Sequence, residues 1–448
     1  MVAAIIAVFA VGYLAITLEH PIKLDKTVPA LMMAAIMWAL LSVGFHFGIV
    51  DVIDSHGHLF TSTGGDHHAS EGFTNTLLHH LGKTAEILVF LIGAMTIVEL
   101  IDLHRGFSII KGWIKTNKKK SLLWIVAILA FILSAIIDNL TATIVLITIL
   151  RKLVPNRKER LWFAGLVVVA ANAGGAWSPI GDVTTTMLWI ENNVSTVGLI
   201  QNLVLPSIVC MVIPVFVASL LPAFQGDITI DDNEYDEESK RLLSSRTMLF
   251  LGLAAIVSVP VFKTITHLPP YVGMMLALGV VWLVSEFIHP EENFDEERKH
   301  LYSPHKALSR IELSSILFFL GILLAVGALE TLVVDGVGTL RYAADMLDAS
   351  IPSKDVVILV LGVASAIIDN VPLVAASMGM YDFPLDDRLW HFIAYAAGTG
   401  GSMLIIGSAA GVAAMGIERI DFIWYLKKIT WLAVIGYLAG AGIFILMS

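Results

Sequence analysis

The sequence contains almost no cysteine and little charge. Cys210 is the only cysteine among 448 residues and lies in an apolar run, which excludes a disulfide framework and a thiolate metal site. Charged residues make up only 15% of the chain and hydrophobic residues 57%, a balance too apolar for a soluble domain with one core. The composition therefore predicts an integral membrane protein.

The chain also lacks the phosphate loop GxxxxGK(S/T) and any soluble segment large enough for an ATPase. We therefore expect no nucleotide, no nucleic acid and no resident cofactor, and any transport would be driven by ion gradients. The first apolar run, residues 2–18, has neither the basic start nor the small-residue cleavage site of a signal peptide. We interpret it as a retained span.

Apolar runs long enough to cross about 30 Å of hydrocarbon occur along the whole chain. Continuous runs cover residues 2–18, 28–47, 87–103, 203–221, 248–262, 271–288, 311–334 and 422–447. Two further runs, 161–190 and 389–415, are interrupted by glycines. The pattern predicts an all-α membrane protein with about ten transmembrane helices.

One hexapeptide, SAIIDN, occurs at residues 134–139 and again at 365–370. Each copy is followed by a double-glycine segment, NAGGAWSPIGD at 172–182 and GTGGSMLIIGS at 398–408. Since unlike motifs recur in the same order, we interpret residues 1–226 and 247–448 as two repeats of one plan.

The flanks of the two hexapeptide regions differ in charge. KTNKKK and RKLVPNRKER, both strongly basic, enclose the first region, whereas IPSKD and YDFPLDDR enclose the second. Two re-entrant hairpins that open on opposite sides of the membrane explain this difference better than single spans. Inverted-topology repeats with broken elements near mid-membrane are typical of secondary transporters.

Lys and Arg residues also predict the orientation of the chain. Most of the 28 fall in six loops, which we place on the cytoplasmic side: 19–27, 105–120, 151–160, 222–246, 289–310 and 416–428. Both termini would then face outward. We expect a multi-pass protein of the cell inner (plasma) membrane.

Each SAIIDN copy places an aspartate and an asparagine where a hairpin must turn, Asp138 with Asn139 and Asp369 with Asn370. A third aspartate, Asp182, ends the first glycine-rich break. Capping of helix ends is one interpretation of these residues. Asn or Ser would cap equally well without burying a charge, and ionisable residues inside a membrane are functional by default. We therefore favour an ion site.

Oxygen-bearing side chains accompany these aspartates. Glycine and proline free carbonyl groups at the breaks, and oxygen ligands suit a small hard cation such as Na+. We expect the cation at Asp138, Asp182 and Asp369, with supporting oxygens from Ser134, Thr141, Asn172, Ser178, Thr184, Thr185, Ser365, Thr399, Ser402 and Ser408. A buried carboxylate can hold a cation or a proton, so the two would compete, and competition with alternating access is antiport.

Histidines gather between residues 46 and 80. They have no fixed ligand spacing, so we interpret them as part of a solvated loop rather than a metal site. His79 and Glu86 stand at the start of the third span and are candidates for proton access, although polar groups at a membrane interface explain them equally well.

These motifs together resemble the NhaD-type sodium/proton antiporters of the ion transporter superfamily. The resemblance covers SAIIDNLTAT, NAGGAWSPIGDVTTT, SAIIDNVPLVAA and GTGGSMLIIGSAAG in that order. It implies a scaffold domain that forms a homodimer and a transport domain that moves like an elevator, joined by arms at 105–118 and 336–350. In the related carboxylate symporters the hairpin tips carry Ser-Asn-Thr, whereas here Asp replaces the serine at both tips.

We expect repeat 1 to place scaffold helices and an arm at 1–120 and half of the transport domain at 121–190. Scaffold helices, a cytoplasmic acidic loop within 222–246 and the second arm follow at 191–352, the other transport half at 353–419 and a last scaffold helix at 420–448. We expect the protein to exchange cytoplasmic Na+ or Li+ for external H+ at the aspartates, and not to be an enzyme. Its surface would contact membrane lipid. The alternatives are a Na+-coupled anion or dicarboxylate symporter and, less favoured because the histidines lie in a loop, a membrane metalloenzyme.

Overall fold

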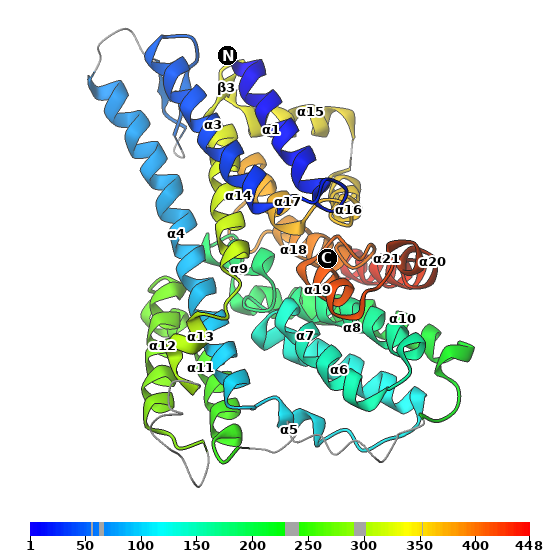
Figure 1. Ribbon diagram of the computed structural model, residues 1–448. Helices are drawn as coiled ribbons and strands as arrows, with labels where there is room; N and C mark the ends of the chain where they lie inside the picture. The colour runs from blue at the N-terminus through cyan, green and yellow to red at the C-terminus, as the bar shows by residue number, and fades with distance from the viewer. Residues whose placement is uncertain (55–56, 62–66, 229–241, 291–301, 352) are drawn as a thin grey trace. The chain divides into compact units, whose positions relative to one another are not determined.

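The chain is predominantly helical (Figure 1). The computed structural model describes residues 1–448 apart from 55–56, 62–66, 229–241, 291–301 and 352, and apart from the side chains of 20–21 and 67–68. His56, the side chains of the adjacent histidines 67 and 68, and most of the acidic loop 222–246 therefore lie outside the described residues. Two compact units are present and are described separately.

Unit 1 contains residues 1–89, 312–360 and 371–384. Its helices and strands are α1 (Val2–Thr17), α2 (Glu19–Ile22), α3 (Thr27–His46), β1 (Val52–Ile53), β2 (Leu59–Phe60), the first part of α4 (His67–Leu103), α14 (Leu313–Thr331), β3 (Val333–Val334), β4 (Val337–Gly338), α15 (Thr339–Ser350), and most of α16 (Lys354–Ala364) and α17 (Asn370–Met380). The strands form two antiparallel pairs, β1 with β2 and β3 with β4.

The core of unit 1 lies between α3 and α14, which pack along each other. Gly321 permits this close approach, because a Cβ there would lie 2.6 Å from the carbonyl carbon of Ala30. The indole Nε1 of Trp38 donates to the Leu324 carbonyl at 2.8 Å. Both helices are apolar on every side, as expected of helices surrounded by protein and lipid.

Unit 2 contains residues 90–311, 361–370 and 385–448. Besides the end of α4 it holds α5 (Ser108–Lys111), α6 (Lys119–Ile137), α7 (Asn139–Leu153), α8 (Arg157–Gly175), α9 (Val183–Ile190), α10 (Thr196–Ser219), the 3₁₀ helix η1 (Pro222–Phe224), α11 (Ser245–Thr266), α12 (Pro270–Phe287), α13 (Pro304–Leu308), α18 (Arg388–Gly400), α19 (Ala409–Glu418), α20 (Phe422–Lys428) and α21 (Thr430–Met447).

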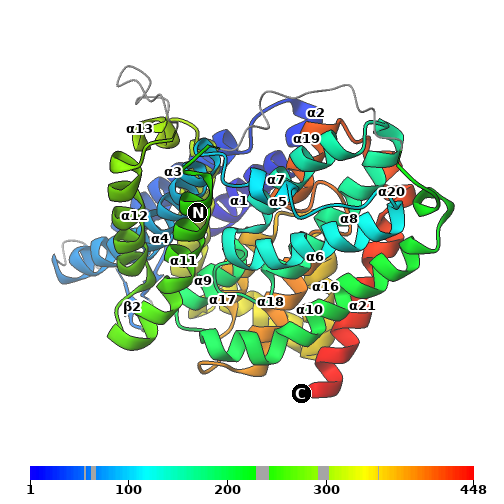
Figure 2. The same cartoon turned by 90° about the horizontal axis from the view of Figure 1, so that it is seen from below.

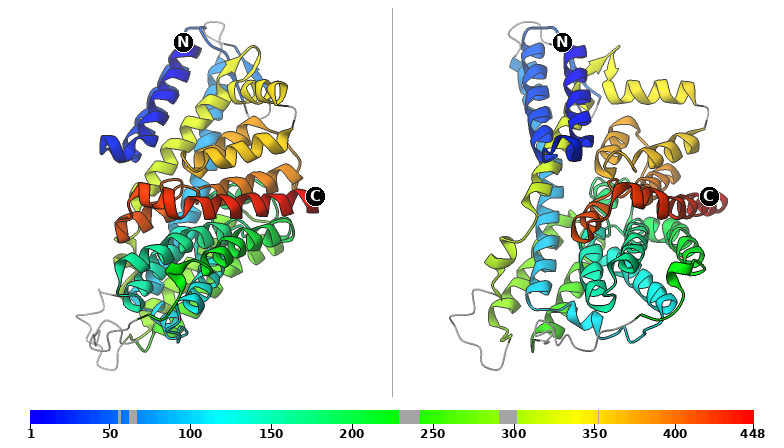
Figure 3. Two further views of the ribbon diagram at one scale, coloured as in Figure 1. Left: turned by 90° about the vertical axis from the view of Figure 1, so that its right-hand side faces the viewer. Right: turned by 45° about the vertical axis from the view of Figure 1, so that its right-hand side comes forward.

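The glycine-interrupted helices form the centre of unit 2. The pair α8 and α9 contacts the pair α18 and α19, and the turn between α6 and α7 packs against them (Figure 2). On one flank α10 runs beside α21 (Figure 3), where Gly436 and Gly440 face the α10 backbone carbonyls of Cys210 and Pro206. Close backbone approach through small residues is the usual packing mode of membrane helices.

In the described residues, eight helices are long and apolar enough to cross a membrane: α3, α4, α6, α10, α11, α12, α14 and α21. This agrees with the expected multi-pass protein. Residues 2–18 form α1, which has 16 residues and a length of about 24 Å at 1.5 Å per residue. The arm α6 has 19 residues, which is enough to span by itself.

The helix α4 is much longer than its expected span, residues 87–103, because it has 37 residues and begins at His67. Its early turns bury one face, at Phe73, Thr76, His80 and Thr84, with helical spacing. Since three of these four side chains are polar, a search for apolar runs does not find this part of the helix.

Three other segments differ from expectation in whole or in part. Residues 105–118, expected as an amphipathic arm, form only the four-residue helix α5. The second expected arm forms a β3–β4 hairpin followed by α15. The last apolar run, 422–447, is divided at Ile429 into α20 and α21.

Candidate ion-binding site

The first SAIIDN copy forms a sharp turn between α6 and α7. Asp138 is both the C-terminal cap of α6 and the N-terminal cap of α7, with φ 83° and ψ 159°. A positive φ is rare and costly for a side chain with a Cβ. The strain is offset by a two-point cap, because the Asp138 carboxylate accepts from the Thr141 amide at 2.7 Å and from the Thr141 hydroxyl at 3.0 Å. The turn therefore points Asn139 into the protein.

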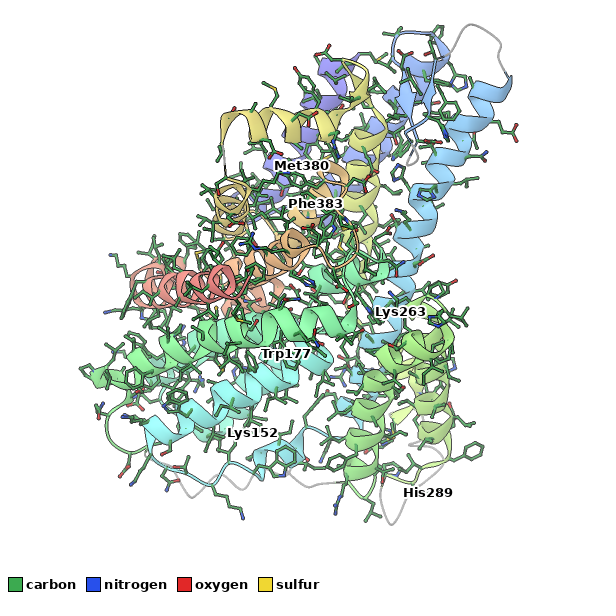
Figure 4. The ribbon with its side chains drawn as sticks, turned by 180° about the vertical axis from the view of Figure 1, so that it is seen from behind. Lys152, Trp177, Lys263, His289, Met380 and Phe383 are labelled. Carbon is green, nitrogen blue, oxygen red and sulfur yellow. The ribbon has the colours of Figure 1, made fainter. Side chains whose placement is uncertain are left out.

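The first glycine-rich break separates α8 from α9. Residues 176–182 run without helical structure, except for turns, and α9 restarts after Asp182. Pro179 cannot continue the helical hydrogen-bond ladder, and Thr186 donates its hydroxyl to the Pro179 carbonyl at 2.9 Å. Trp177, labelled in Figure 4, stacks on the ring of Phe131 from α6 at 5.9 Å. The break is therefore held against the hairpin.

Asp182 lies at the centre of the candidate site, and its side chain is 3% exposed. Its carboxylate accepts from the Asn139 amide at 3.2 Å, from the Asn370 amide at 3.0 Å and from the Thr184 hydroxyl at 2.5 Å. Although Asp182 occupies the first cap of α9, it makes no side-chain capping bond. Its carboxylate thus connects the two SAIIDN turns.

The second break joins the same network through Ser408. The Asn139 amide also donates to the Asn172 side-chain oxygen at 3.0 Å, and the Asn172 amide donates to the Ser408 hydroxyl at 3.0 Å. Ser408 caps α19 by accepting from the Gly411 amide at 3.2 Å. Residues from α7, α8, α9, α19 and the second SAIIDN turn therefore meet within one buried cluster.

Equivalent contacts occur at matching positions of the two SAIIDN segments. The Ser134 hydroxyl donates to the Ala171 carbonyl at 2.5 Å, and the Ser365 hydroxyl donates to the Ala397 carbonyl at 2.9 Å. Thus each SAIIDN serine attaches its hairpin arm to the helix that precedes a break.

The double glycines are matched in the same way. A Cβ at Gly174 would collide with the Phe131 carbonyl, and a Cβ at Gly400 would collide with the Gly362 carbonyl. Both glycines therefore let a hairpin arm lie directly on the break that follows it in sequence.

Several expected ligands lie outside the Asp182 cluster or are already bonded within one helix. Thr399 and Ser402 donate to carbonyls of α18, and Thr185 donates to the Asp182 carbonyl at 2.9 Å. Ser178 is buried and accepts from the Ile180 amide at 3.4 Å. Asp369 is half-buried at the second turn, directly before Asn370.

The candidates for proton access belong to unit 1. His79 is exposed on α4 and Glu86 is half-buried. The interpretation of the histidines as part of a solvated loop is wrong for the neighbouring His80, which is buried on α4. Its ring Nε2 lies 3.0 Å from the Thr331 hydroxyl, and its ring lies 5.9 Å from that of Trp38.

The cluster is rich in oxygen and amide groups rather than in carboxylates. No group of three His, Cys, Asp or Glu side chains within the described ranges lies close enough to hold one metal ion together. No Lys or Arg in that part of the chain bonds to Asp182, whose partners are the three neutral donors given above. Asp138, Asp182 and Ser408 are the N-terminal caps of α7, α9 and α19, and Asn370 is the first residue of α17. The positive ends of these helices favour negative charge there.

Comparisons with known proteins agree with this architecture. The family model for citrate transporters matches residues 13–382. Sodium/proton antiporter 1 of Arabidopsis thaliana is 45% identical over 98% of this chain and 71% of its own length. The Na(+)/H(+) antiporter NhaD of Vibrio cholerae is 30% identical over 99% of this chain and 91% of its own. Among solved structures, the YdaH transporter of Alcanivorax borkumensis has a TM-score of 0.61 at 14% identity, over 94% of this chain and 97% of that one.

Proposed function

Because the chain belongs to the citrate transporter family and to the NhaD-type sodium/proton antiporters, we propose that it exchanges Na+ or Li+ for H+ at Asp182. Cytoplasmic sodium would leave as external protons enter. The relatives are named as transporters and antiporters, so an enzymatic activity is not expected. Transported ions, rather than a resident cofactor, would occupy the site.

The observation that carries this proposal is the environment of Asp182. In a medium of low dielectric constant, the ionised form of a buried carboxylate that only neutral donors stabilise is costly. A proton or a monovalent cation removes that charge, and the two cannot occupy the same oxygen at once. Binding of sodium therefore requires release of a proton, which is the chemical basis of exchange.

The side-chain amides of the asparagines at the two turns explain how a cation could bind with side chains that are already at the site. Asn139 and Asn370 present NH₂ groups to Asp182. A rotation of each amide about its last bond would present the carbonyl oxygen instead, at the same place. Together with the Asp182 carboxylate and the Ser408 hydroxyl, these oxygens form a ligand set suited to Na+. Asp138 and Asp369, beside the two asparagines, would hold the local potential negative.

Alternating access is the second part of the proposal. Ser134 and Ser365 make equivalent contacts in the two halves of the chain, and so do Gly174 and Gly400. This correspondence favours two repeats of one plan, which we propose to be of opposite orientation. A site at their junction could be exposed to either side as the repeats exchange conformations. This proposal includes a division into scaffold and transport domains, an elevator-like movement of the transport domain, and a homodimer formed by the scaffold helices.

The predicted cytoplasmic loops of unit 2 contact one another, which supports their placement on one side. The loop 105–120 contacts the loop 151–160 through Lys119 and Glu159 at 2.7 Å. It contacts 222–246 where the Ile228 amide donates to the Asn117 carbonyl at 2.7 Å. We propose that this side is cytoplasmic in the plasma membrane and that both termini face outward.

Ion-driven pH changes in everted membrane vesicles would test the proposed function. A fluorescent dye would report the internal pH after addition of Na+, Li+, K+ or citrate. We expect Na+ and Li+ to release protons from the lumen, and K+ and citrate to have no effect. A sodium-dependent accumulation of citrate without proton exchange would instead identify an anion symporter.

A further inference from the structure

A second buried carboxylate, Glu418, lies at the far end of α19 from Ser408. Its side chain is 1% exposed, and each of its oxygens binds a different arginine. The Arg151 Nε lies 2.7 Å from one oxygen, and the Arg160 Nε lies 2.9 Å from the other. The two arginines come from the end of α7 and the start of α8, so one carboxylate joins three helices.

Arginines of the same connection also bind the last backbone carbonyls of α19. Arg151 donates to the Ile417 carbonyl, and Arg157 donates to the carbonyls of Glu418 and Arg419 at 3.0 and 2.9 Å. The last carbonyls of a helix have no partner within it and carry its negative end. The α7–α8 connection therefore caps α19 from outside.

The two helices held in this way both begin at the candidate ion site. The helix α7 runs from Asn139 towards Arg151, and α19 runs from the Ser408 cap to Glu418. They pack against each other along the way. At the near ends, Asn172 connects Asn139 to Ser408. The arginine cluster therefore fixes the far ends of two helices whose near ends would hold the cation.

Stability alone explains this cluster poorly. The desolvation of a buried ion pair can cancel its electrostatic attraction, and apolar residues of similar volume often stabilise a protein at least as well. The planar guanidinium group of an arginine has fixed donor directions. It can therefore bind a carboxylate and a backbone carbonyl together only when the two helices have one relative position. An axial shift of α19 along α7 would break these bonds.

We propose that Glu418, together with Arg151 and Arg160, is a positioning residue that fixes α19 lengthwise against α7 and so sets the distance between the sodium ligands at their near ends. This inference rests on the proposed function of the Asp182 cluster. Sodium requires ligands at nearly fixed distances, so a shift of either helix would weaken cation binding before it stopped the transport cycle.

The test is the half-saturating Na+ concentration and the maximal exchange rate of Glu418→Gln in everted vesicles. We expect half-saturation to rise at least about threefold, within the range of coupling through packed elements. Glu159→Gln is the matched control, because Glu159 also pairs with a basic residue, Lys119, and its oxygen lies 2.7 Å away. This control should keep the half-saturating Na+ of the parent.

Arg151→Lys provides a second variant in case Glu418→Gln does not fold, since Arg151 is about half exposed. Lysine keeps the charge but loses the fork, so half-saturation should rise in the same direction. A parental half-saturating Na+ in either folded variant, even with a lower unfolding temperature, would overturn the proposal. If Asp182→Asn loses exchange while Glu418→Gln keeps the half-saturating Na+ of the parent, only the positioning role is refuted. Normal exchange in Asp182→Asn would refute both the positioning role and the proposed function.

Discussion

Asp138 and Asp182 both occupy the N-terminal cap position of a helix, but their carboxylates have different partners. Asp138 caps α7 through the amide and hydroxyl of Thr141. Asp182 does not cap α9 and instead binds groups from both SAIIDN turns. The capping interpretation therefore describes Asp138, while the position of Asp182 favours ion exchange.

Asp182→Asn should leave the protein folded and abolish exchange. The amide has the same size, but it cannot lose a proton and its NH₂ group would face the amides of Asn139 and Asn370. We expect the exchange rate to fall by more than about 100-fold, beyond the loss typical of an outer-shell partner of a metal. Ser408→Ala should have a milder effect, because its hydroxyl is neutral. Near-parental Na+/H+ exchange in Asp182→Asn would return this residue to a structural role.

Substitutions of Asp138 should separate its cap from its charge. Asp138→Ala removes both bonds to Thr141 and should destabilise the protein by about 1 kcal/mol, as for other helix caps. Asp138→Asn keeps an acceptor oxygen, so its unfolding temperature in detergent should stay near that of the parent while its half-saturating Na+ rises. An equal loss of stability in both variants would contradict this assignment.

At the scale of elements, the hairpins and breaks depend on glycines that have no room for a side chain. Gly174→Ala and Gly400→Ala would each drive a Cβ into a backbone carbonyl of the adjacent arm. Overpacking of this kind costs about 1–3 kcal/mol, so the unfolding temperature and exchange should both fall. Gly416→Ala is the control, since nothing lies within 4 Å of its added Cβ in α19. Parental behaviour of all three would show that the close approach is unimportant.

The sequence predicts these elements unevenly, for physical reasons. Glycine and proline at 174–181 act locally on the helical ladder, so the break between α8 and α9 can be recognised from the sequence. The first half of α4 cannot be recognised by hydropathy, because His80 and Thr84 occupy its buried face. Glu418 resembles an ordinary loop charge until the fold brings Arg151 and Arg160 to it.

The candidate site shows the same limit. Asp182 and the two asparagines follow from a repeated motif and a glycine-rich break. Their bonding pattern, in which one aspartate accepts from both turns while another caps its own helix, depends on tertiary contacts. The hydroxyls of Thr399 and Ser402 are predicted to lie near the ion only because they stand near a break in the sequence, whereas both donate to carbonyls of α18.

At the scale of the whole molecule, the orientation can be tested with single cysteines. Lys158, at the start of α8, and Lys427, at the end of α20, are exposed on the side placed in the cytoplasm, and Leu385 is 58% exposed in a loop placed outside. The natural Cys210 is buried and should contribute little background. A membrane-impermeant thiol reagent should label Lys158→Cys and Lys427→Cys only in everted vesicles, and Leu385→Cys only in right-side-out vesicles. Labelling of all three from one side would contradict the proposed topology.

The central claim is that sodium and protons compete for one buried carboxylate, Asp182. Its most direct test is the half-saturating Na+ concentration for exchange by the parent protein, measured from mildly acidic to alkaline pH. If each sodium displaces a proton, half-saturating Na+ should fall by up to about tenfold per pH unit until the carboxylate is ionised, and then level off, while the maximal rate changes less. A half-saturating Na+ that stayed constant across this range would contradict the shared site.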